Sequence, residues 1–467
     1  MFRFLALLLL IAAGPALAGP LPATVAGALN DARIPATAVA IVVRPLDGAT
    51  PLVEHNPDAP MNPASVMKLL TTYAALDLLG PAHTWATDAW IDAPAVDGVV
   101  DGNMYLQGSG SPRFVAEDLW NLLRRLRVRG IRHIAGDVVL DRGVFDVPRI
   151  DPGAFDAKPM RPYNVGPDGL LIDFQTLRFT LQPDLGRTRV LLETPNAVLV
   201  IDNRLRSSDE PCRSDWKDRI RTQLAGDGRT LEFSGHYPAA CGEKTLNLAP
   251  LSADAQADGL IRALWRELGG TLAGRVRSGS VPAGAQRVAR QESPPLADVV
   301  RDINKFSNNV MARQLFLTLG NDTAPATPER ARARLAGWLT ARRLDFPELV
   351  VDNGSGLSRS ERISAGSLGR LLADAWRNPV MPEFMSSLPV VGVDGTMKKR
   401  LNGSPASGRA HIKSGSLEGV RSAAGYALDA QGRRYAVVCL INHPQAAAGG
   451  AAIDALLAWV ARGGRDD

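Results

Sequence analysis

Cysteine, histidine and lysine are all scarce in this chain, which holds three cysteines, six histidines and eight lysines among 467 residues. No histidine or cysteine lies at the spacing of a metal site, and three cysteines are too few for a disulfide-rich scaffold. The 53 basic residues exceed the 48 acidic ones by only five and are scattered along the chain, so the sequence has no footprint for nucleic acid. We therefore expect no metal, no cofactor and no nucleic-acid partner.

Long apolar runs are also missing. The apolar run at residues 4–13 is too short to span a bilayer, and it lies between Arg3 and the small-residue site Ala16-Leu17-Ala18. This pattern is typical of a signal peptide, here residues 1–18. No cysteine follows the cleavage site, so a lipid anchor is not expected there. We therefore predict an exported protein. The last predicted helix, near residues 451–460, has an apolar face that is suited to core packing, so we expect at most peripheral membrane contact.

The three cysteines fall in two kinds of surroundings. Cys212 and Cys241 lie in polar, loop-like segments, whereas Cys439 lies in an apolar run typical of a buried strand. In an oxidising compartment the first two are a plausible disulfide, and the third is expected to be a core thiol.

The length and spacing of the apolar runs change twice along the chain. Between about residues 85 and 291, short apolar runs are broken by Gly, Pro and Asp, which predicts mostly strands, with helices near 116–128 and 257–268. Outside this stretch, strands are predicted near 38–43, 52–54, 423–428 and 435–441, and helices near 296–319, 327–341 and 365–377. The outer segments therefore resemble one α/β unit that is split by an insertion of about 200 residues.

Ser65 and Lys68 lie at the head of one apolar helix. Asn62 suits the N-cap, Pro63 the first helical position, and Gly80-Pro81 the end. The apolar residues that recur at helical spacing are Val66, Leu69, Leu70 and Tyr73. The Ser65 hydroxyl is then one turn from an amine that could take its proton, which is how a weak nucleophile is activated without histidine.

Ser-x-x-Lys alone is a weak signal, and Ser214-Asp215-Trp216-Lys217 matches it too. This second match has neither a helix cap nor apolar periodicity, so we interpret it as a chance occurrence on a polar loop. Taken by itself, Ser65 could equally be an ordinary helix start, so a catalytic role for it depends on other motifs in the chain.

Two further polar motifs follow in the chain. Ser307-Asn308-Asn309 lies within the predicted helix 296–319, and Ser307 could relay a proton while Asn309 holds a substrate amide. Lys413-Ser414-Gly415-Ser416 is predicted on an edge strand, where the amine and the Ser414 hydroxyl could bind a carboxylate. Gly415 would allow close approach of the backbone, and the Ser416 N–H could face an oxyanion.

Ser-x-x-Lys, Ser-x-Asn and Lys-Ser/Thr-Gly in this order resemble the signature of β-lactamases and penicillin-binding proteins. The chain as a whole resembles the D-alanyl-D-alanine carboxypeptidase/endopeptidases with inserted domains, the class C low-molecular-mass penicillin-binding proteins. The segments that add to this resemblance are residues 136–141, 162–164, 352–359, 393–397 and 442–444. Asn308 and Ser414 replace the more frequent Asp and Thr, and both keep the polar chemistry.

The resemblance implies a penicillin-binding catalytic domain, an antiparallel sheet with helices on both sides, interrupted by two mainly β inserted domains. The expected limits are 19–83 with 291–467 for the catalytic domain, 84–150 with 250–290 for one inserted domain and 151–249 for the other. It also implies a periplasmic location.

The same resemblance implies a role for each motif residue. Ser65 would be the nucleophile and Lys68 its base, with Ser307 passing a proton to the leaving amine. The residues expected to bind the substrate are Asn309, Lys413, Ser414, Gly415 and Ser416. The substrates would be peptidoglycan stem peptides, cleaved at D-Ala-D-Ala or at D-Ala-diamino acid cross-links, and β-lactams would inhibit. Two alternatives stay open: a β-lactam hydrolase that uses the same serine, and a non-catalytic cell-wall binding protein.

Overall fold

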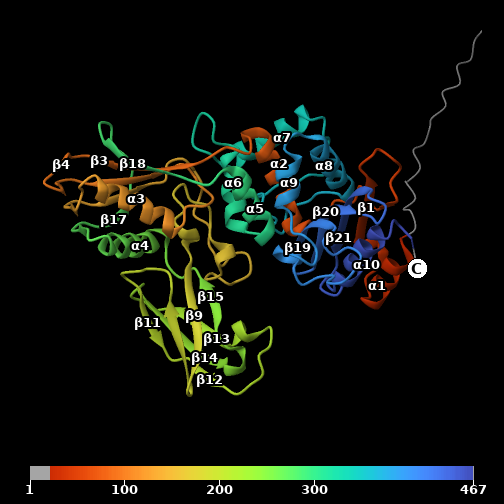
Figure 1. The fold of residues 1–467 in the computed structure, drawn as a ribbon, viewed down its shortest axis with the longest axis horizontal. Helices are drawn as coiled ribbons and strands as arrows, with labels where there is room; N and C mark the ends of the chain where they lie inside the picture. Colours follow the sequence, from red (N-terminus) through yellow and green to blue (C-terminus); the bar gives the residue numbers. More distant parts are fainter. Residues whose placement is uncertain (1–20, 466–467) are drawn as a thin grey trace, which may run out of the picture.

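The computed structural model describes residues 21–465, so the predicted signal peptide lies outside the described residues. The molecule is elongated, with the segments from the two ends of the chain at one end and the inserted residues at the other (Figure 1). A seven-stranded sheet projects to one side of the long axis. The fold is mixed α/β with several sheets, as expected.

The sheet near the chain ends has the strand order β19-β20-β21-β1-β2, and every neighbouring pair is antiparallel. Its strands are β1 (Val39–Pro45), β2 (Val53–His55), β19 (Ala410–Leu417), β20 (Val420–Leu428) and β21 (Arg434–Asn442). The four strands predicted in this unit are present within about three residues, and the strand that carries Lys413 lies at the edge, as expected.

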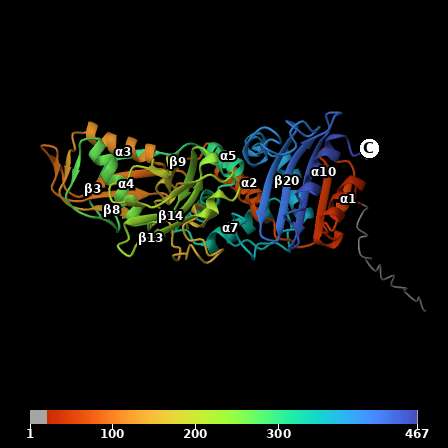
Figure 2. The same ribbon diagram turned by 90° about the horizontal axis from the view of Figure 1, so that it is seen from below.

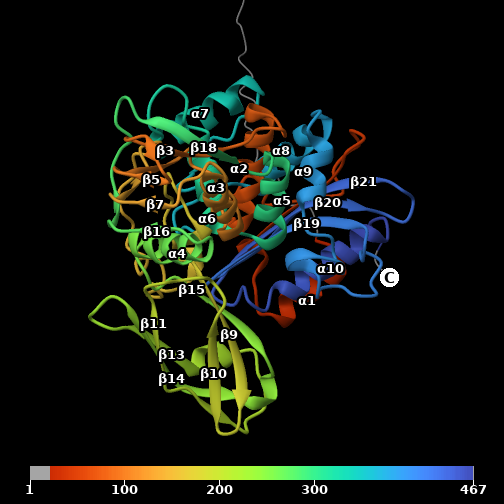
Figure 3. The ribbon, with the colours of Figure 1, turned by 60° about the vertical axis from the view of Figure 1, so that its left-hand side comes forward.

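Side chains alternate between the two faces of this sheet and so build two cores. Ile41 and Val43 pack on the side of α1 (Ala23–Asp31) and α10 (Gly450–Ala461). Val42 packs on the other side, which is covered by α8 (Ala365–Arg377) and the helices around α2. The two views in Figures 2 and 3 agree that α1 and α10 lie on one face and α2 on the other.

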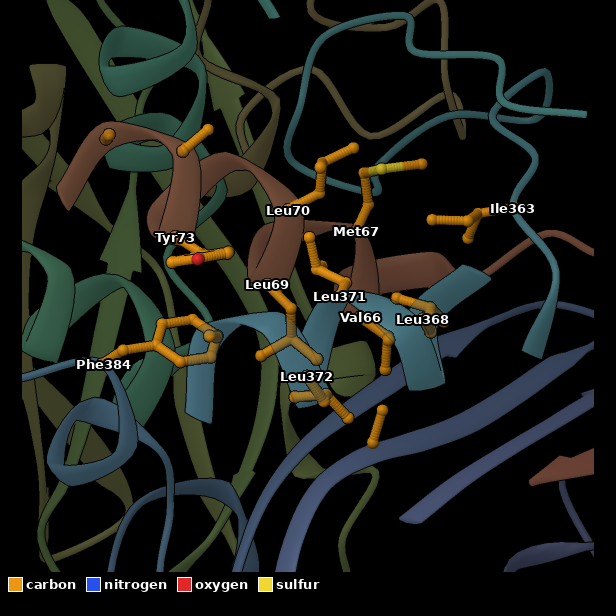
Figure 4. Close-up of a cluster of buried hydrophobic side chains, with 14 of the residues drawn as sticks. Val66, Met67, Leu69, Leu70, Tyr73, Ile363, Leu368, Leu371, Leu372 and Phe384 are labelled. Atoms are coloured by element: carbon orange, nitrogen blue, oxygen red, sulfur yellow. The ribbon is translucent and has the colours of Figure 1, made fainter. Parts of the chain in front are cut away.

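The helix α2 (Lys68–Leu79) is buried nearly all round rather than along one stripe. Leu69, Leu70 and Tyr73 pack in one core with Leu368 and Leu372 of α8 (Figure 4). Its polar residues Lys68, Thr71 and Thr72 are buried as well. The predicted apolar face was thus right but incomplete, because helices also cover the opposite side. The remaining helices of this unit are α5 (Leu296–Phe306), α6 (Asn309–Thr318), α7 (Pro328–Ala341) and α9 (Met381–Ser387).

The prediction that the α-helix begins at Pro63 was wrong. Residues Ala64–Met67 form a 3₁₀ turn, and the α-helix begins at Lys68. Ala64 has a left-handed φ of 46°, which an α-helix does not allow. Asn62 still holds the head of this turn, because its Oδ1 accepts a hydrogen bond from the Ala64 N–H at 2.9 Å.

The predicted single helix 296–319 was also wrong, because the polar motif divides it. Ser307 takes a left-handed φ of 54° after α5, and Asn308 then caps α6 by accepting from the Met311 N–H at 3.1 Å. The Ser307 and Asn309 side chains are thereby held at a junction of two helices instead of on one helical face.

The inserted residues form three sheets. One has the order β17-β8-β6-β3-β18 and another β16-β7-β5-β4, and both combine strands from the two ends of the insertion. Their strands are β3 (Ala86–Ile91), β4 (Ala95–Val96), β5 (Val99–Val100), β6 (Met104–Gly108), β7 (His133–Ile134), β8 (Val138–Asp141), β16 (Thr271–Leu272), β17 (Val276–Ser278) and β18 (Gln286–Glu292). Helices α3 (Ala116–Val128) and α4 (Ala253–Glu267), both predicted, share one core with these strands.

The third sheet lies wholly within the middle of the insertion. It comprises β9 (Leu177–Asp184), β10 (Arg187–Leu192), β11 (Val200–Asn203), β12 (Arg206–Ser208), β13 (Ile220–Leu224), β14 (Thr230–Pro238) and β15 (Lys244–Leu248). A disulfide joins Cys212 to Cys241 beside it, and Cys439 is a buried thiol in the sheet near the chain ends. The residue limits at which the insertion divides into two domains stay a prediction.

Within residues 21–465, every helix is too short or too polar to cross a membrane.

Candidate active site

Lys68 points into a fully buried position beside Ser65. Its Nζ lies 3.0 Å from Ser65 Oγ and 2.5 Å from Asn309 Oδ1, and it also donates to the Ser355 carbonyl oxygen. The 3₁₀ turn and the first turn of α2 bring Ser65 and Lys68 to one side, and the start of α6 supplies Asn309. The first and second predicted motifs therefore meet at one amine.

Burial is the main reason that the pKa of the Lys68 amine lies well below its ordinary value. The positive charge of Lys413 lowers this pKa further, and the Glu361 carboxylate opposes the shift. A lowered pKa increases the fraction of neutral amine, and only the neutral amine can accept the Ser65 proton. This arrangement can activate a serine hydroxyl without a histidine.

Lys413 lies on β19 and contacts the second motif from behind the strand edge. Its Nζ is fully buried and donates to Ser307 Oγ and to the Ser414 carbonyl oxygen, each at 2.9 Å. Burial lowers the pKa of Lys413 to about 7. The third motif is therefore connected to the second through the Ser307 hydroxyl.

Gly415 lies where β19 passes the turn that carries Ser65. A Cβ at this position would lie 3.0 Å from the Ser65 backbone nitrogen and 2.8 Å from the Pro63 carbonyl oxygen. The same carbonyl accepts a hydrogen bond from Ser422 Oγ at 2.6 Å, which ties β20 to the turn. Only glycine allows this approach, so the strand edge and the nucleophile turn form one corner.

The loop of residues 352–361 packs against the turn that carries Ser65. It supplies the Ser355 carbonyl to Lys68, and Gly356 packs so closely on the turn that a Cβ would lie 2.7 Å from the Ser65 nitrogen. Glu361 Oε1 accepts hydrogen bonds from the backbone N–H groups of Asp352, Asn353 and Gly354 at 2.9–3.3 Å. Desolvation raises the pKa of this buried carboxyl to about 7. The sequence analysis missed Glu361, because a lone acidic residue after a turn carries no signal.

Thr396 is a second residue that the sequence analysis did not assign. Its Oγ1 lies 2.8 Å from Ser414 Oγ, so two hydroxyls stand together beside the strand edge. Lys305 of α5 fixes the preceding turn by pairing with Asp394 at 2.7 Å and by donating to the Leu388 carbonyl. Segment 393–397 is part of the family resemblance, but the contact between Thr396 and Ser414 of β19 becomes visible only in the folded chain.

These residues surround a cleft of about 550 Å³. Its lining consists of Ser65, Ser307, Asn309, Thr396, Arg400, Ser414, Gly415, Ser416, Arg421, Ser422, Gly450, Ile453 and Asp454. Lys68 and Lys413 lie behind this lining, because their amines are turned toward the hydroxyl groups of Ser65 and Ser307. In this structure the Lys413 amine contacts Ser307 Oγ, and its contact with a substrate carboxylate stays a prediction.

Ser214 and Lys217, the second Ser-x-x-Lys match, lie beside the seven-stranded sheet, outside this cleft. Both are exposed, and the Lys217 amine lies over the Trp216 ring at 5.3 Å from its centroid. Among residues 21–465, no three or more His, Cys, Asp or Glu side chains are grouped so that they could hold a metal ion.

Comparisons with known proteins agree over nearly the whole described chain. The family model described as "D-Ala-D-Ala carboxypeptidase 3 (S13) family" matches residues 21–463. The chain is 30% identical over 393 residues to a D-alanyl-D-alanine carboxypeptidase of Actinomadura sp. (strain R39), which covers 78% of this chain and 70% of the relative. It is 26% identical over 401 residues to the D-alanyl-D-alanine carboxypeptidase DacB of Haemophilus influenzae, covering 84% of this chain and 82% of that protein.

Solved structures show the same fold. The crystal structure of penicillin binding protein 4 from Haemophilus influenzae superposes with a TM-score of 0.77 at 23% identity, over 93% of this chain and 98% of that one. A predatory endopeptidase from Bdellovibrio bacteriovorus superposes with a TM-score of 0.55 at 15% identity, over 91% and 94% of the two chains.

Proposed function

The chain belongs to the D-Ala-D-Ala carboxypeptidase 3 (S13) family, and from this premise we propose how its own residues carry out serine DD-peptidase chemistry. The enzyme is a D-Ala-D-Ala carboxypeptidase that acts on peptidoglycan stem peptides through an acyl-serine intermediate. It also binds β-lactams, as its relative from Haemophilus influenzae does in a complex with a β-lactam.

The neutral Lys68 amine takes the proton of Ser65, and Ser65 Oγ attacks the carbonyl carbon between the two D-Ala residues. The negative oxygen that forms is held by the backbone N–H groups of Ser65 and Ser416, at the corner created by Gly415. The carbon–nitrogen bond then breaks, and Ser307 relays a proton to the departing amine. Water finally cleaves the ester and releases the shortened peptide.

The substrate is positioned by groups on both sides of the cleft. Asn309, which lines the cleft and accepts a hydrogen bond from Lys68, holds the amide of the penultimate residue. The hydroxyls of Ser414 and Thr396 bind the terminal carboxylate, because they stand together and face the cleft. Lys413 acts from behind them, by orienting the Ser307 hydroxyl with its buried ammonium.

The single observation that carries this proposal is the 3.0 Å contact between the buried Lys68 amine and Ser65 Oγ. The test is to incubate the protein with penicillin and locate the adduct by peptide mass mapping. We expect a single acyl group on Ser65. A label on Ser214, or no label at all, would contradict the assignment.

The balance of activities is tested separately with purified muropeptides. Loss of D-Ala from monomeric muropeptides measures carboxypeptidase activity, and conversion of cross-linked dimers to monomers measures endopeptidase activity. The lifetime of the penicillin adduct distinguishes the alternative enzyme, because a peptidase keeps the adduct for hours whereas a β-lactam hydrolase releases it in under about a second.

We further propose that the enzyme works in the periplasm without a nucleic-acid partner and with at most peripheral membrane contact. The scattered basic residues and the predicted signal peptide support this location. Fractionation of cells that produce the full chain tests it, and recovery with the cytoplasmic fraction would argue against export.

A further inference from the structure

A positive charge within the cleft would strengthen the binding of a carboxylate on the leaving part of the substrate, and the amines of both lysines are engaged by protein groups. Lys413 is fully buried and its amine is engaged by Ser307 and by the Ser414 carbonyl. Lys68 is equally buried and faces Ser65. The cations that line the cleft itself are Arg400 and Arg421.

These two arginines differ in whether an acidic side chain of the protein already pairs with the guanidinium group. Arg400 donates to Asp454 at 2.6 Å and to the Gly450 carbonyl, so a carboxylate of the protein holds its guanidinium. Arg421 donates only to its neighbouring Val420 carbonyl at 3.2 Å, and in the described part of the chain it forms no ion pair. Its side chain is half-buried, which leaves the charge open to the cleft.

The sheet register puts Arg421 on the wall that carries the Ser414 hydroxyl. Arg421 of β20 is the direct cross-strand partner of Ser416 in β19. Ser414 lies two residues before Ser416 on the same strand, and side chains two residues apart point to the same face. A carboxylate bound by Ser414 and Thr396 would therefore lie on the same face as the Arg421 guanidinium.

We propose, on the premise of the proposed function, that Arg421 binds the free carboxylate of the leaving group and so determines which leaving amines are accepted. Guanidinium groups bind carboxylates through two parallel hydrogen bonds, which fix direction as well as charge. The favoured substrates are those whose leaving amine bears a carboxylate on the adjacent carbon. D-Ala meets this condition, as does a diamino acid that is linked through the amine beside its carboxyl group. An amine at the end of a plain alkyl side chain does not.

The test compares two peptides that end in D-Ala-D-Ala, one with a free carboxylate and one with a carboxamide. Arg421→Gln removes the charge and retains most of the side-chain length, and Arg421→Lys restores a charge without the planar fork. Arg409→Gln is the matched control, because Arg409 is exposed just before β19, at the end of the strand remote from Ser416, and is absent from the cleft lining.

On the free-acid peptide, we expect Arg421→Gln to lower kcat/KM by about 10- to 100-fold, mainly through KM. On the carboxamide the loss should be less than about threefold, and Arg421→Lys should recover part of the difference. Arg409→Gln should match the wild type on both peptides. Equal losses on the two peptides would overturn the role of Arg421 while leaving the proposed function standing. A wild-type enzyme that forms no acyl-Ser65 adduct would overturn both.

Discussion

The chain contains Ser-x-x-Lys in two regions, and only one copy has the contacts of a reactive pair. Lys68 is fully buried and bonds Ser65 Oγ, whereas Lys217 is exposed and lies over the Trp216 ring. The first copy is packed among helices and the edge of an antiparallel sheet, and the second lies on the surface of the inserted seven-stranded sheet. The two copies share the same sequence spacing, but only the first has a buried lysine that contacts its serine.

The comparison shows that the surroundings of a lysine, and not its spacing from a serine, allow it to act as a base. Burial lowers the pKa of Lys68, and the neighbouring Lys413 lowers it further, because two positive charges in one desolvated site disfavour each other. Three oxygen atoms, from Ser65, Asn309 and Ser355, then fix the direction of the amine. Each prediction below changes one of these conditions or tests the region that lacks them.

The largest effect is expected from removing the buried base. Lys68→Ala should lower the rate of penicillin acylation by about 1,000-fold or more, because general-base catalysis typically contributes 10²- to 10⁴-fold and the pair acts as a unit. Stopped-flow or quenched acylation measures the rate, and circular dichroism verifies that the variant folds. The matched variant Lys217→Ala, in the other copy of the motif, should acylate at the wild-type rate. A comparable loss in that variant would remove the distinction between the two regions.

Removing the second buried amine should have a smaller effect. Lys413→Ala leaves the Ser307 hydroxyl without its donor and should lower kcat/KM by about 10- to 100-fold. Because the contact is with Ser307, the loss should be similar on free-acid and carboxamide peptides. This outcome separates Lys413 from Arg421, whose loss should be confined to the free acid. A loss confined to the free acid in Lys413→Ala would instead indicate that its amine contacts the carboxylate directly.

The helices, strands and motifs of the catalytic unit could be predicted from the sequence, but the contacts that bring the motif residues together could not. Helix 365–377 and the strands near 423–428 and 435–441 follow from apolar periodicity, and the structure has them close to the predicted bounds. The left-handed Ala64 could not be predicted, because its turn packs against Gly356 and Gly415 from distant parts of the chain. The roles of Thr396 and Glu361 depend in the same way on which backbone atoms lie beside them after folding.

A moderate, pH-dependent effect is expected at Glu361. Its carboxylate raises the pKa of Lys68, so Glu361→Gln should lower that pKa while keeping an acceptor for the three loop N–H groups. Acylation increases with pH as Lys68 loses its proton, so this rising limb should move to lower pH in the variant. Below about pH 7 the two profiles should converge, because wild-type Glu361 then becomes protonated too.

The pH dependence of penicillin acylation measures this shift. Glu348→Gln is the control, because Glu348 accepts hydrogen bonds from Ser364 and Ser367 and is not among the residues around the cleft. The control profile should overlay the wild type. If the Glu361→Gln profile overlays it as well at every pH, the carboxylate charge does not act on Lys68.

The smallest effect on catalysis is expected from the disulfide beside the second motif copy. Cys212 and Cys241, which are 29 residues apart, close a loop of the inserted region, and such a cross-link typically contributes about 3–4 kcal/mol to stability. Replacing both cysteines by serine should therefore lower the unfolding temperature of the inserted region, measured by calorimetry and by proteolysis within residues 200–250. Penicillin acylation should stay within about twofold of the wild type, because no residue of this loop lines the cleft.

Cys439→Ser makes the same sulfur-to-oxygen change in the catalytic sheet, where it introduces a hydroxyl into a packed core, and should lower acylation together with stability. If instead the loss of the disulfide abolished acylation while Cys439→Ser left it intact, the chemistry would depend on the inserted region, and the contrast between the two copies of the motif would not hold.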